Sequence, residues 1–260
     1  MLPLKDDIPT RRFPILTVAI IVACVVVYFG FERGGLGLGD TGNEVVLEYG
    51  AIPYEVTHPG DDCGATPAGN IACEGQAGVQ GQAPDQAPWW LTILTSMFLH
   101  GGLLHLAGNM LFLWVFGNNI EDSMGRVRFV AFYLLGGIAA LAAQTLIDPG
   151  AAVPTVGASG AIAAVLGGYA LLYPRARVVT VVFIIIIFTI VRLPALLVLG
   201  LWFLLQVLYG ASELGQPLGG SGGVAYFAHI GGFVFGLALI RLFANDVHED
   251  YDVQRRIPVY

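Results

Sequence analysis

The stretch VPTVGASGAIAAV, residues 153–165, joins a glycine-rich turn to the start of an apolar helix. Ser159 opens that helix, and the apolar run ends at Tyr173. Pro149 and Pro154 keep the preceding residues non-helical. A helix of this length is about 22 Å long, which is shorter than the roughly 30 Å core of a bilayer. The stretch therefore predicts a helix whose N-terminus, carrying a serine, lies below a membrane surface.

The composition is that of a membrane protein with several spans. Of the 260 residues, 56% are hydrophobic and 12% are charged, and the mean hydropathy is +0.72. Soluble domains carry about twice this share of charge. No basic patch indicates a nucleic-acid partner, and the three cysteines lack metal-ligand spacing. The sequence predicts no nucleic acid, no metal ion and no cofactor.

Five further stretches are long and apolar enough to cross a bilayer. They are Phe13–Phe31, Leu99–Asn118, Val127–Ile147, Leu193–Gly210 and Val224–Phe243. Together with Ser159–Tyr173 they predict an all-α polytopic membrane protein, with six transmembrane helices over residues 13–243. The fourth helix is the short, sunken one.

The segment Val178–Val191, VVTVVFIIIIFTIV, is apolar but has only 14 residues and lies between Arg177 and Arg192. We interpret it as an interfacial or re-entrant segment and not as a seventh span. Six spans with an internal N-terminus put eleven of the twelve Lys and Arg residues on the cytoplasmic side, as the positive-inside rule favours. The sequence thus predicts a multi-pass protein of the cell membrane (inner or plasma membrane) with both termini in the cytoplasm.

Three segments lie outside the predicted membrane helices. Residues 1–12 form a cytoplasmic N-terminus, and residues 244–260 form a polar, disordered cytoplasmic tail. Residues 32–95 contain the outer loop, and its insertion, about residues 55–87, is rich in Gly, Pro, Ala and Gln and is expected to be largely irregular. Cys63 and Cys73 fall in this loop, where oxidation can join them in a disulfide.

Ser159 has two interpretations. Serine is a preferred N-cap residue, which is an ordinary structural role. The alternative is catalysis, because irregular backbone at membrane depth persists only where it is buried in protein or lines a wet cavity. His229 favours catalysis, since it lies five residues into the sixth span, at nearly the depth of Ser159. An ionisable residue inside a membrane is a functional candidate.

Small residues recur at four-residue spacing in the fourth and sixth spans, a pattern that lets membrane helices approach closely. They are Gly160, Ala164 and Gly168 in the fourth span and Ala228, Gly232 and Gly236 in the sixth.

No Asp or Glu lies within a predicted span, and the nearest, Glu121 and Asp122, follow the second. We therefore predict a catalytic dyad, with Ser159 as nucleophile and His229 as general base and then acid.

The second span carries two candidate oxyanion donors. His105 and Asn109 are four residues apart and share a helix face in the outer half of the membrane. They can stabilise negative charge together with the backbone N–H of Ser159. An interhelical hydrogen bond that stabilises the fold is the other role, and the two roles are compatible. His100, at the membrane boundary and off this face, is predicted to be structural.

These motifs resemble the rhomboid intramembrane serine proteases. The resemblance covers roughly residues 88–243 and consists of three motifs in order: HxxxxHxxxN (His100, His105, Asn109), GxSG (Gly157, Ser159, Gly160) and AHxxG (Ala228, His229, Gly232). It implies a six-helix core and a Ser–His dyad without cofactor. It also implies that the partners are the lipid bilayer and single-pass transmembrane proteins, which are cleaved near their outer ends.

The sequence departs from the family in two places. Many relatives have Trp-Arg before the first motif, where this chain has Trp89-Trp90. Some relatives place an aromatic residue after the serine to stack on the histidine, where this chain has Ala163.

The alternative function is that of a catalytically inactive rhomboid-like protein that binds or escorts membrane proteins. A small-molecule transporter would require repeats that are not seen. The GxGD of residues 37–40 mimics an aspartyl protease motif but has no intramembrane Asp partner.

Overall fold

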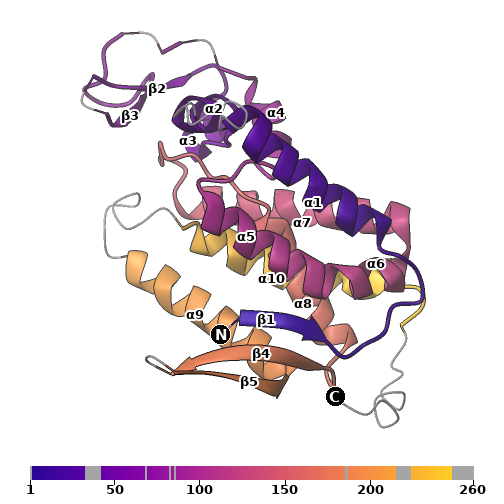
Figure 1. Cartoon of the computed structure of the whole chain (residues 1–260). Coiled ribbons are helices and arrows are strands. Elements are labelled where there is room, and N and C mark those ends of the chain that lie inside the picture. Colours follow the sequence, from indigo (N-terminus) through magenta and orange to yellow (C-terminus); the bar gives the residue numbers. More distant parts are fainter. Residues whose placement is uncertain are drawn as a thin grey trace.

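The computed structural model describes residues 2–32, 42–67, 69–81, 83–84, 86–184, 187–214 and 224–247. These residues form a helical bundle with a small sheet at one end, the sheet end, and residues 42–88 at the other, the insertion end (Figure 1). The bundle helices are α1 (Ile15–Val27), α5 (Leu103–Phe112), α7 (Arg126–Ile147), α8 (Ser159–Leu172), α9 (Ala195–Glu213) and α10 (Tyr226–Phe243). The π-helical turn η1 (Tyr28–Glu32) continues α1. The π-helical turn η2 (Leu113–Gly117) and α6 (Asn118–Met124) continue α5.

Five of the described helical stretches are long and apolar enough to cross a membrane: Ile15–Glu32, Leu103–Met124, Arg126–Ile147, Ala195–Glu213 and Tyr226–Phe243. The sixth bundle helix, α8, has 14 residues and is apolar. This arrangement confirms the predicted polytopic helical bundle with a short fourth helix.

Helix α8 lies at the centre of the bundle. All of its residues except Ser159 and Leu171 are buried, and α7 and α10 both pack against it. Glycines permit this close packing: a Cβ atom on Gly232 would overlap the carbonyl oxygen of Gly160, and one on Gly236 would overlap that of Ala164. The small-residue stripes of the fourth and sixth spans are therefore the surfaces on which α8 and α10 meet.

We expect Gly236→Ala to destabilise the protein by at least about 1–3 kcal/mol, because the added methyl group must push the backbones of α8 and α10 apart. Thermal unfolding in detergent measures the effect. Gly200→Ala in α9 is the matched control, since no atom lies within 4 Å of its new Cβ, and helix propensity there favours alanine by up to about 1 kcal/mol. Equal melting temperatures for the two variants would contradict the close contact.

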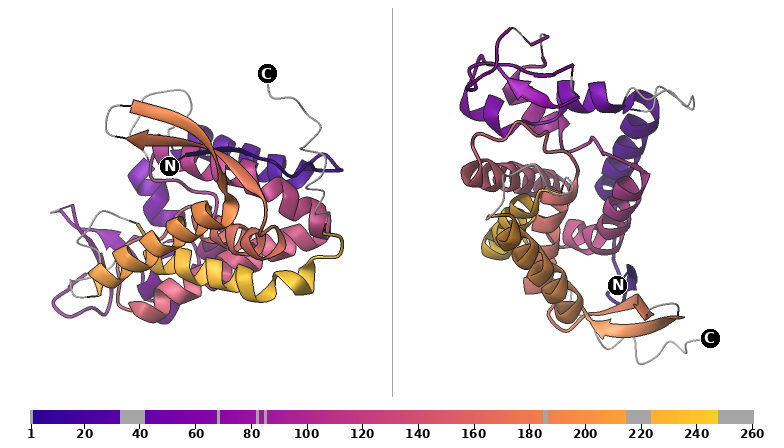
Figure 2. Two further views of the ribbon diagram at one scale, coloured as in Figure 1. Left: turned by 90° about the horizontal axis from the view of Figure 1, so that it is seen from below. Right: turned by 90° about the vertical axis from the view of Figure 1, so that its left-hand side faces the viewer.

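The sheet end holds strands that the sequence analysis did not predict. β1 (Leu2–Asp6) pairs antiparallel with β4 (Arg177–Ile184), which pairs antiparallel with β5 (Ile187–Pro194). Figure 2 shows this sheet at the opposite end of the bundle from the insertion. The segment 178–191 is thus a hairpin and not a span, and its β-branched residues favour strands. The predicted polytopic helical bundle therefore carries, in addition to its helices, a three-stranded sheet to which Leu2–Asp6 contributes a strand.

Asp6, the last residue of β1, is buried between the sheet and the bundle. One carboxylate oxygen accepts hydrogen bonds from Asn119 Nδ2 at 2.5 Å and from the Tyr169 hydroxyl at 2.7 Å. Burial raises the pKa of Asp6 from 3.8 to about 7, although the bond from Tyr169 opposes the rise. The carboxyl group therefore binds its proton more tightly in the folded protein than in the unfolded chain.

A raised carboxyl pKa stabilises the fold at low pH. The contribution of Asp6 is fully present below its unfolded pKa, near 3.8, and is lost as pH rises through about 7. A pKa difference of this size between the folded and unfolded states corresponds to about 4 kcal/mol in the free energy of unfolding. We expect Asp6→Asn to flatten the fall in melting temperature between these pH values. Asp246→Asn, which removes an exposed carboxylate, is the control; an unchanged pH profile in Asp6→Asn would contradict this assignment.

The insertion end contains α2 (Gly42–Tyr49), α3 (Pro53–Thr57) and the strand pair β2 (Cys63–Ala65) and β3 (Ile71–Cys73), and α4 (Trp89–Thr95) follows it. Cys63 and Cys73 lie opposite each other in the strand pair and form a disulfide, which confirms the predicted bridge. Between residues 55 and 87, the described residues outside the end of α3 and the short strands β2 and β3 form no helix or strand, so this insertion is largely irregular, as predicted.

Four carboxylates lie within the helical stretches assigned as spans, contrary to the sequence analysis: Glu32, Glu121, Asp122 and Glu213. Two of them, Glu121 and Glu32, are buried. The second span extends to Met124 and so includes Glu121, which is buried and accepts bonds from the backbone N–H groups of Leu16 and Thr17 at the start of α1. This contact places negative charge at a helix N-terminus, where it is favourable. Glu32 ends the first span and is also buried. Neither carboxylate contacts the candidate dyad.

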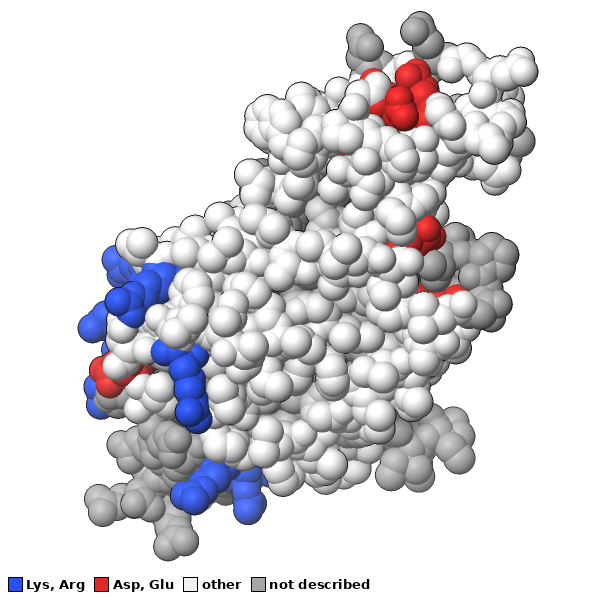
Figure 3. Space-filling view, turned by 180° about the vertical axis from the view of Figure 1, so that it is seen from behind, with Lys and Arg blue, Asp and Glu red and all other residues white. Residues whose placement is uncertain are grey.

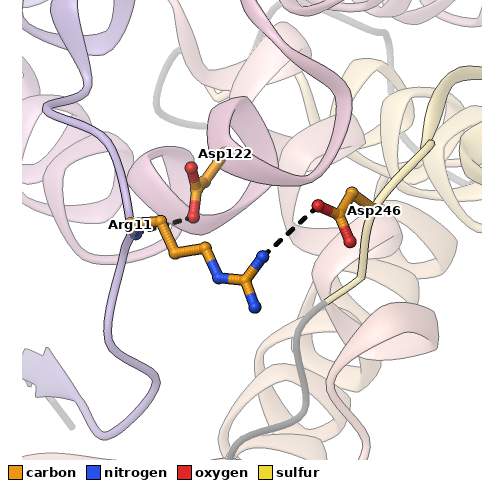
Figure 4. Close-up of polar contacts among 3 residues, drawn as sticks. All are labelled: Arg11, Asp122 and Asp246. Carbon is orange, nitrogen blue, oxygen red and sulfur yellow. Dashed lines mark hydrogen bonds and ion pairs between the residues drawn. The ribbon is translucent and has the colours of Figure 1, made fainter.

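Charge is segregated between the ends of the bundle. Figure 3 shows Lys and Arg gathered at one end of the visible face and most Asp and Glu at the other. At the basic end, Arg11 donates its backbone N–H to Asp122 at 2.9 Å and pairs with Asp246 at 3.5 Å (Figure 4). Both members of the ion pair are more than half exposed, so the pair contributes at most about 1 kcal/mol.

Candidate active site

Ser159 is the first residue of α8, at the insertion end of the bundle. The loop before it is held by backbone hydrogen bonds from Thr155 N to Ala51 O and from Gly157 N to Ser96 O, each 2.8 Å long. The insertion adds a bond from the Thr57 hydroxyl to the carbonyl oxygen of Pro149. Non-helical backbone at this depth is therefore satisfied by protein, as the sequence analysis required.

Gly157 is the residue that brings this loop against α5. Its φ of +124° favours glycine. A Cβ atom at this position would also lie 2.8 Å from the ring of His105. The loop can therefore pass directly over His105 only because residue 157 has no side chain. This places the predicted GxSG motif beside the predicted oxyanion residues.

Ser159 and His229 meet across the contact between α8 and α10. His229 lies three residues before Gly232, whose close approach to Gly160 fixes the spacing of the two helices. His229 Nε2 is 2.8 Å from Ser159 Oγ, and both side chains are half-buried. This is the separation at which an imidazole nitrogen accepts a hydroxyl proton. The structure thus brings together the two residues of the predicted dyad.

Two residues of α9 complete the surroundings of His229. Gln206 is buried, and its Oε1 lies 2.7 Å from His229 Nδ1. The ring of Trp202 lies 5.7 Å from the imidazole, centre to centre, at an interplanar angle of 39°. Sequence reasoning missed both, although a Trp and a Gln four residues apart in an apolar span were a visible signal. Trp202 provides the aromatic neighbour that Ala163 cannot.

Asn109 and His105 lie on the other side of Ser159. Asn109 is buried, and its Nδ2 has no hydrogen-bond partner among the residues that the structure describes. Nδ2 is also only 3.6 Å from the position of a Cβ on Gly157, so it lies beside the loop that leads to the serine. A buried donor without a partner is costly and calls for an explanation. The backbone N–H of Ser159 belongs to the first turn of α8, whose N–H groups have no partner within the helix.

His100 lies behind these donors. It is buried, and its backbone N–H is 3.0 and 3.1 Å from the two carboxylate oxygens of Glu32. Its ring contacts that of His105 edge to face at 5.2 Å. These contacts fit the predicted structural role, because His100 supports His105 and joins the first span to the second.

A cavity of about 790 Å³ connects the residues of the candidate site. Its wall includes the dyad, both oxyanion candidates and Trp202. Its wall also includes Leu104 of α5 and Glu213 of α9, so the cavity reaches both the second and the fifth spans. The GxGD of residues 37–40 lies outside the described residues, as do residues 215–223, which follow α9 and are rich in glycine.

Comparison with known proteins identifies the family. The rhomboid domain family model matches residues 87–246. Rhomboid protease GluP of Bacillus subtilis is 44% identical over 88 residues, which are 34% of this chain and 16% of that protein. The mitochondrial Rhomboid protein 1 of Saccharomyces cerevisiae is 31% identical over 153 residues, 56% of this chain and 40% of that protein. Mouse presenilin-associated rhomboid-like protein is 34% identical over 99 residues, 37% of this chain and 26% of that protein.

The matched regions of these relatives make up two fifths of their length or less. The domain match, by contrast, includes the three sequence motifs and all the bundle helices from α5 to α10. It covers more than half of the chain, which confirms the resemblance seen in the motifs. The chain belongs to the rhomboid family.

Proposed function

We propose that this chain is an intramembrane serine endopeptidase that cleaves transmembrane proteins near the outer ends of their helices. The observation that carries the proposal is the 2.8 Å contact between Ser159 Oγ and His229 Nε2 on the wall of a cavity inside the bundle. An N-cap serine has no need of such a partner, and an escort protein has no need of a nucleophile paired with a base.

Acylation begins with attack of Ser159 Oγ on a substrate carbonyl carbon. His229 Nε2 takes the hydroxyl proton as the new C–O bond forms, and the carbonyl oxygen becomes an anion. The backbone N–H of Ser159, Asn109 Nδ2–H and the ring N–H of His105 are the proposed donors to that oxygen. When the tetrahedral intermediate collapses, the C–N bond breaks and His229 returns the proton to the leaving amine.

Hydrolysis of the acyl-enzyme regenerates the serine. Water attacks the ester carbonyl, His229 removes a proton from the water, and Ser159 leaves with that proton. The cavity supports this step because polar groups of the site line it, and its wall includes Pro53 at the insertion end. Every proton transfer in this scheme passes through His229, and no bound metal or cofactor is invoked.

The substrate class follows from the position of the dyad in the bundle. A helix that arrives from the bilayer can reach the cavity between α5 and α9, and it must unwind before a carbonyl is exposed. Substrates are therefore single-pass segments with helix-breaking residues near one end. Because Lys and Arg gather at the sheet end, we place that end, residues 1–12 and residues 244–260 in the cytoplasm, and the protein in the cell membrane.

A fluorophosphonate probe tests the proposal. In purified protein reconstituted in liposomes, we expect covalent labelling that mass spectrometry maps to Ser159, and cleavage of a single-pass reporter near its outer end. Ser159→Ala should lose both. Specific binding of the reporter without labelling or cleavage would overturn the protease proposal and support the escort alternative.

A further inference from the structure

Gln206 is the polar side chain of α9 that faces the candidate dyad. It is buried, and its Oε1 lies 2.7 Å from His229 Nδ1, on the side of the imidazole opposite Ser159. The other residues of the same helix turn are Leu204, Leu205, Val207 and Leu208, which are at least partly exposed. A polar residue on the protein-facing side of an apolar helix calls for a specific explanation.

The orientation of the Gln206 amide is fixed by a second bond. Its Nε2 donates to the backbone carbonyl oxygen of Trp202, one turn earlier in α9, at 3.2 Å. A carbonyl oxygen can only accept, so the nitrogen of the amide must face Trp202. The oxygen, Oε1, must then face His229. If the amide were flipped, Oε1 would face the carbonyl oxygen of Trp202, and two acceptors would oppose each other. The NH₂ group would then face His229 Nδ1.

This orientation determines where His229 carries its proton. Oε1 can only accept, so the hydrogen bond at 2.7 Å requires a proton on Nδ1. In a neutral imidazole the other nitrogen, Nε2, then has a lone pair. That lone pair faces the Ser159 hydroxyl at 2.8 Å, which is the arrangement that a general base requires.

We propose that Gln206 is a positioning residue that holds His229 in the Nδ1–H tautomer and orients its ring toward Ser159. The inference rests on the proposed protease function, in which His229 is the base. Gln206 takes the place that a carboxylate occupies in a catalytic triad. A neutral amide performs this task without the cost of a buried charge at membrane depth. Oε1 also accepts a hydrogen bond from Nδ1–H throughout the reaction, including the steps in which His229 is an imidazolium.

Gln206→Met tests this role, because the methionine side chain is of similar length but lacks an oxygen that accepts a hydrogen bond from Nδ1–H. We expect the rate of fluorophosphonate labelling at Ser159, and kcat for a reporter, to fall by about 10- to 100-fold. KM should change little, since Gln206 does not contact substrate. Gln206→Glu restores an acceptor oxygen and should recover much of the loss. A purely structural role predicts the reverse order, because a carboxylate is harder to bury than a thioether.

Two further measurements make the outcome decisive. Leu208→Met, at an exposed position of the same helix, should leave labelling and melting temperature unchanged. The ¹⁵N chemical shifts of His229, assigned by comparison with His229→Gln, report the tautomer directly and without catalysis. We expect Nδ1–H in the wild-type protein and a mixture in Gln206→Met.

The two proposals fail in different ways. If the wild-type protein is not labelled at Ser159, the protease function is wrong, and the ¹⁵N shifts still test the tautomer. If the wild-type protein is labelled and Gln206→Met reacts at the same rate with the same ¹⁵N shifts, the positioning role of Gln206 is overturned and the protease function stands.

Discussion

Replacing Ser159 by alanine should lower turnover of a transmembrane reporter by about 10⁶-fold, and replacing His229 by alanine should have a similar effect. Neither half of the dyad can act alone, because the hydroxyl is a weak nucleophile until His229 Nε2, 2.8 Å away, accepts its proton. The double variant should therefore be no slower than either single variant. Initial rates of reporter cleavage in liposomes measure all three.

The loss of turnover reports on the catalytic step only if the variants remain folded. Ser159 is half-buried at the start of α8, and the Gly160–Gly232 contact that joins α8 to α10 does not involve its side chain. We expect melting temperatures close to that of the wild-type protein. Ser212→Ala, which removes an exposed hydroxyl from α9, is the matched control and should retain full activity. Substantial cleavage by Ser159→Ala would remove the serine from the mechanism.

Sequence patterns were sufficient to predict that Ser159 and His229 meet. The length of the fourth span gave the depth of the serine, and the hydropathy of the sixth gave that of the histidine. The rotation of the sixth helix followed from its small residues, since Gly232 lies where the backbones of α10 and α8 touch. Depth and rotation together fix a position on a membrane helix.

Gln206 could not be placed in the same way. Apart from Gln206 the fifth span is apolar around its whole circumference, and it has no small-residue stripe, so its hydropathy pattern does not encode its rotation about the axis. The third member of a catalytic triad is usually a carboxylate, whereas Gln206 is an amide. The structure shows that α9 turns Trp202 and Gln206 toward His229. The signal in the sequence is that Gln206 is a polar hydrogen-bond acceptor within an apolar span.

The sheet end and the buried carboxylates were missed for another reason. β4 and β5 resemble a short membrane segment in composition, and only pairing with residues 2–6, far away in the sequence, identifies them as part of a three-stranded sheet. The hydropathy pattern ends the second span at Asn118, before Glu121. The helix instead continues past the apolar core, where Glu121 binds the start of α1.

We propose that Asn109 Nδ2, which has no hydrogen-bond partner among the described residues, serves the negative charge that develops during catalysis. A buried N–H that bonds to nothing in the resting protein destabilises it, and function is one reason to retain such a group. In the tetrahedral intermediate this N–H meets an oxyanion in a site of low dielectric, where preorganised donors are most effective. His105 lies one helical turn away and against Gly157, so its ring reaches the same loop.

Asn109→Ala should therefore lower kcat by about 100- to 1000-fold, which corresponds to about 3–4 kcal/mol, with nearly unchanged substrate binding. Asn109→Asp is the sharper variant, because it keeps the shape of the side chain and replaces the donor by an oxygen that repels the oxyanion. His105→Ala should also reduce turnover. Both Asn109 variants should keep a melting temperature near that of the wild-type protein, since Nδ2 has no partner to lose among the described residues. Normal turnover in a destabilised Asn109→Ala protein would instead assign Asn109 to packing, and the oxyanion would then depend on His105 and the backbone of Ser159.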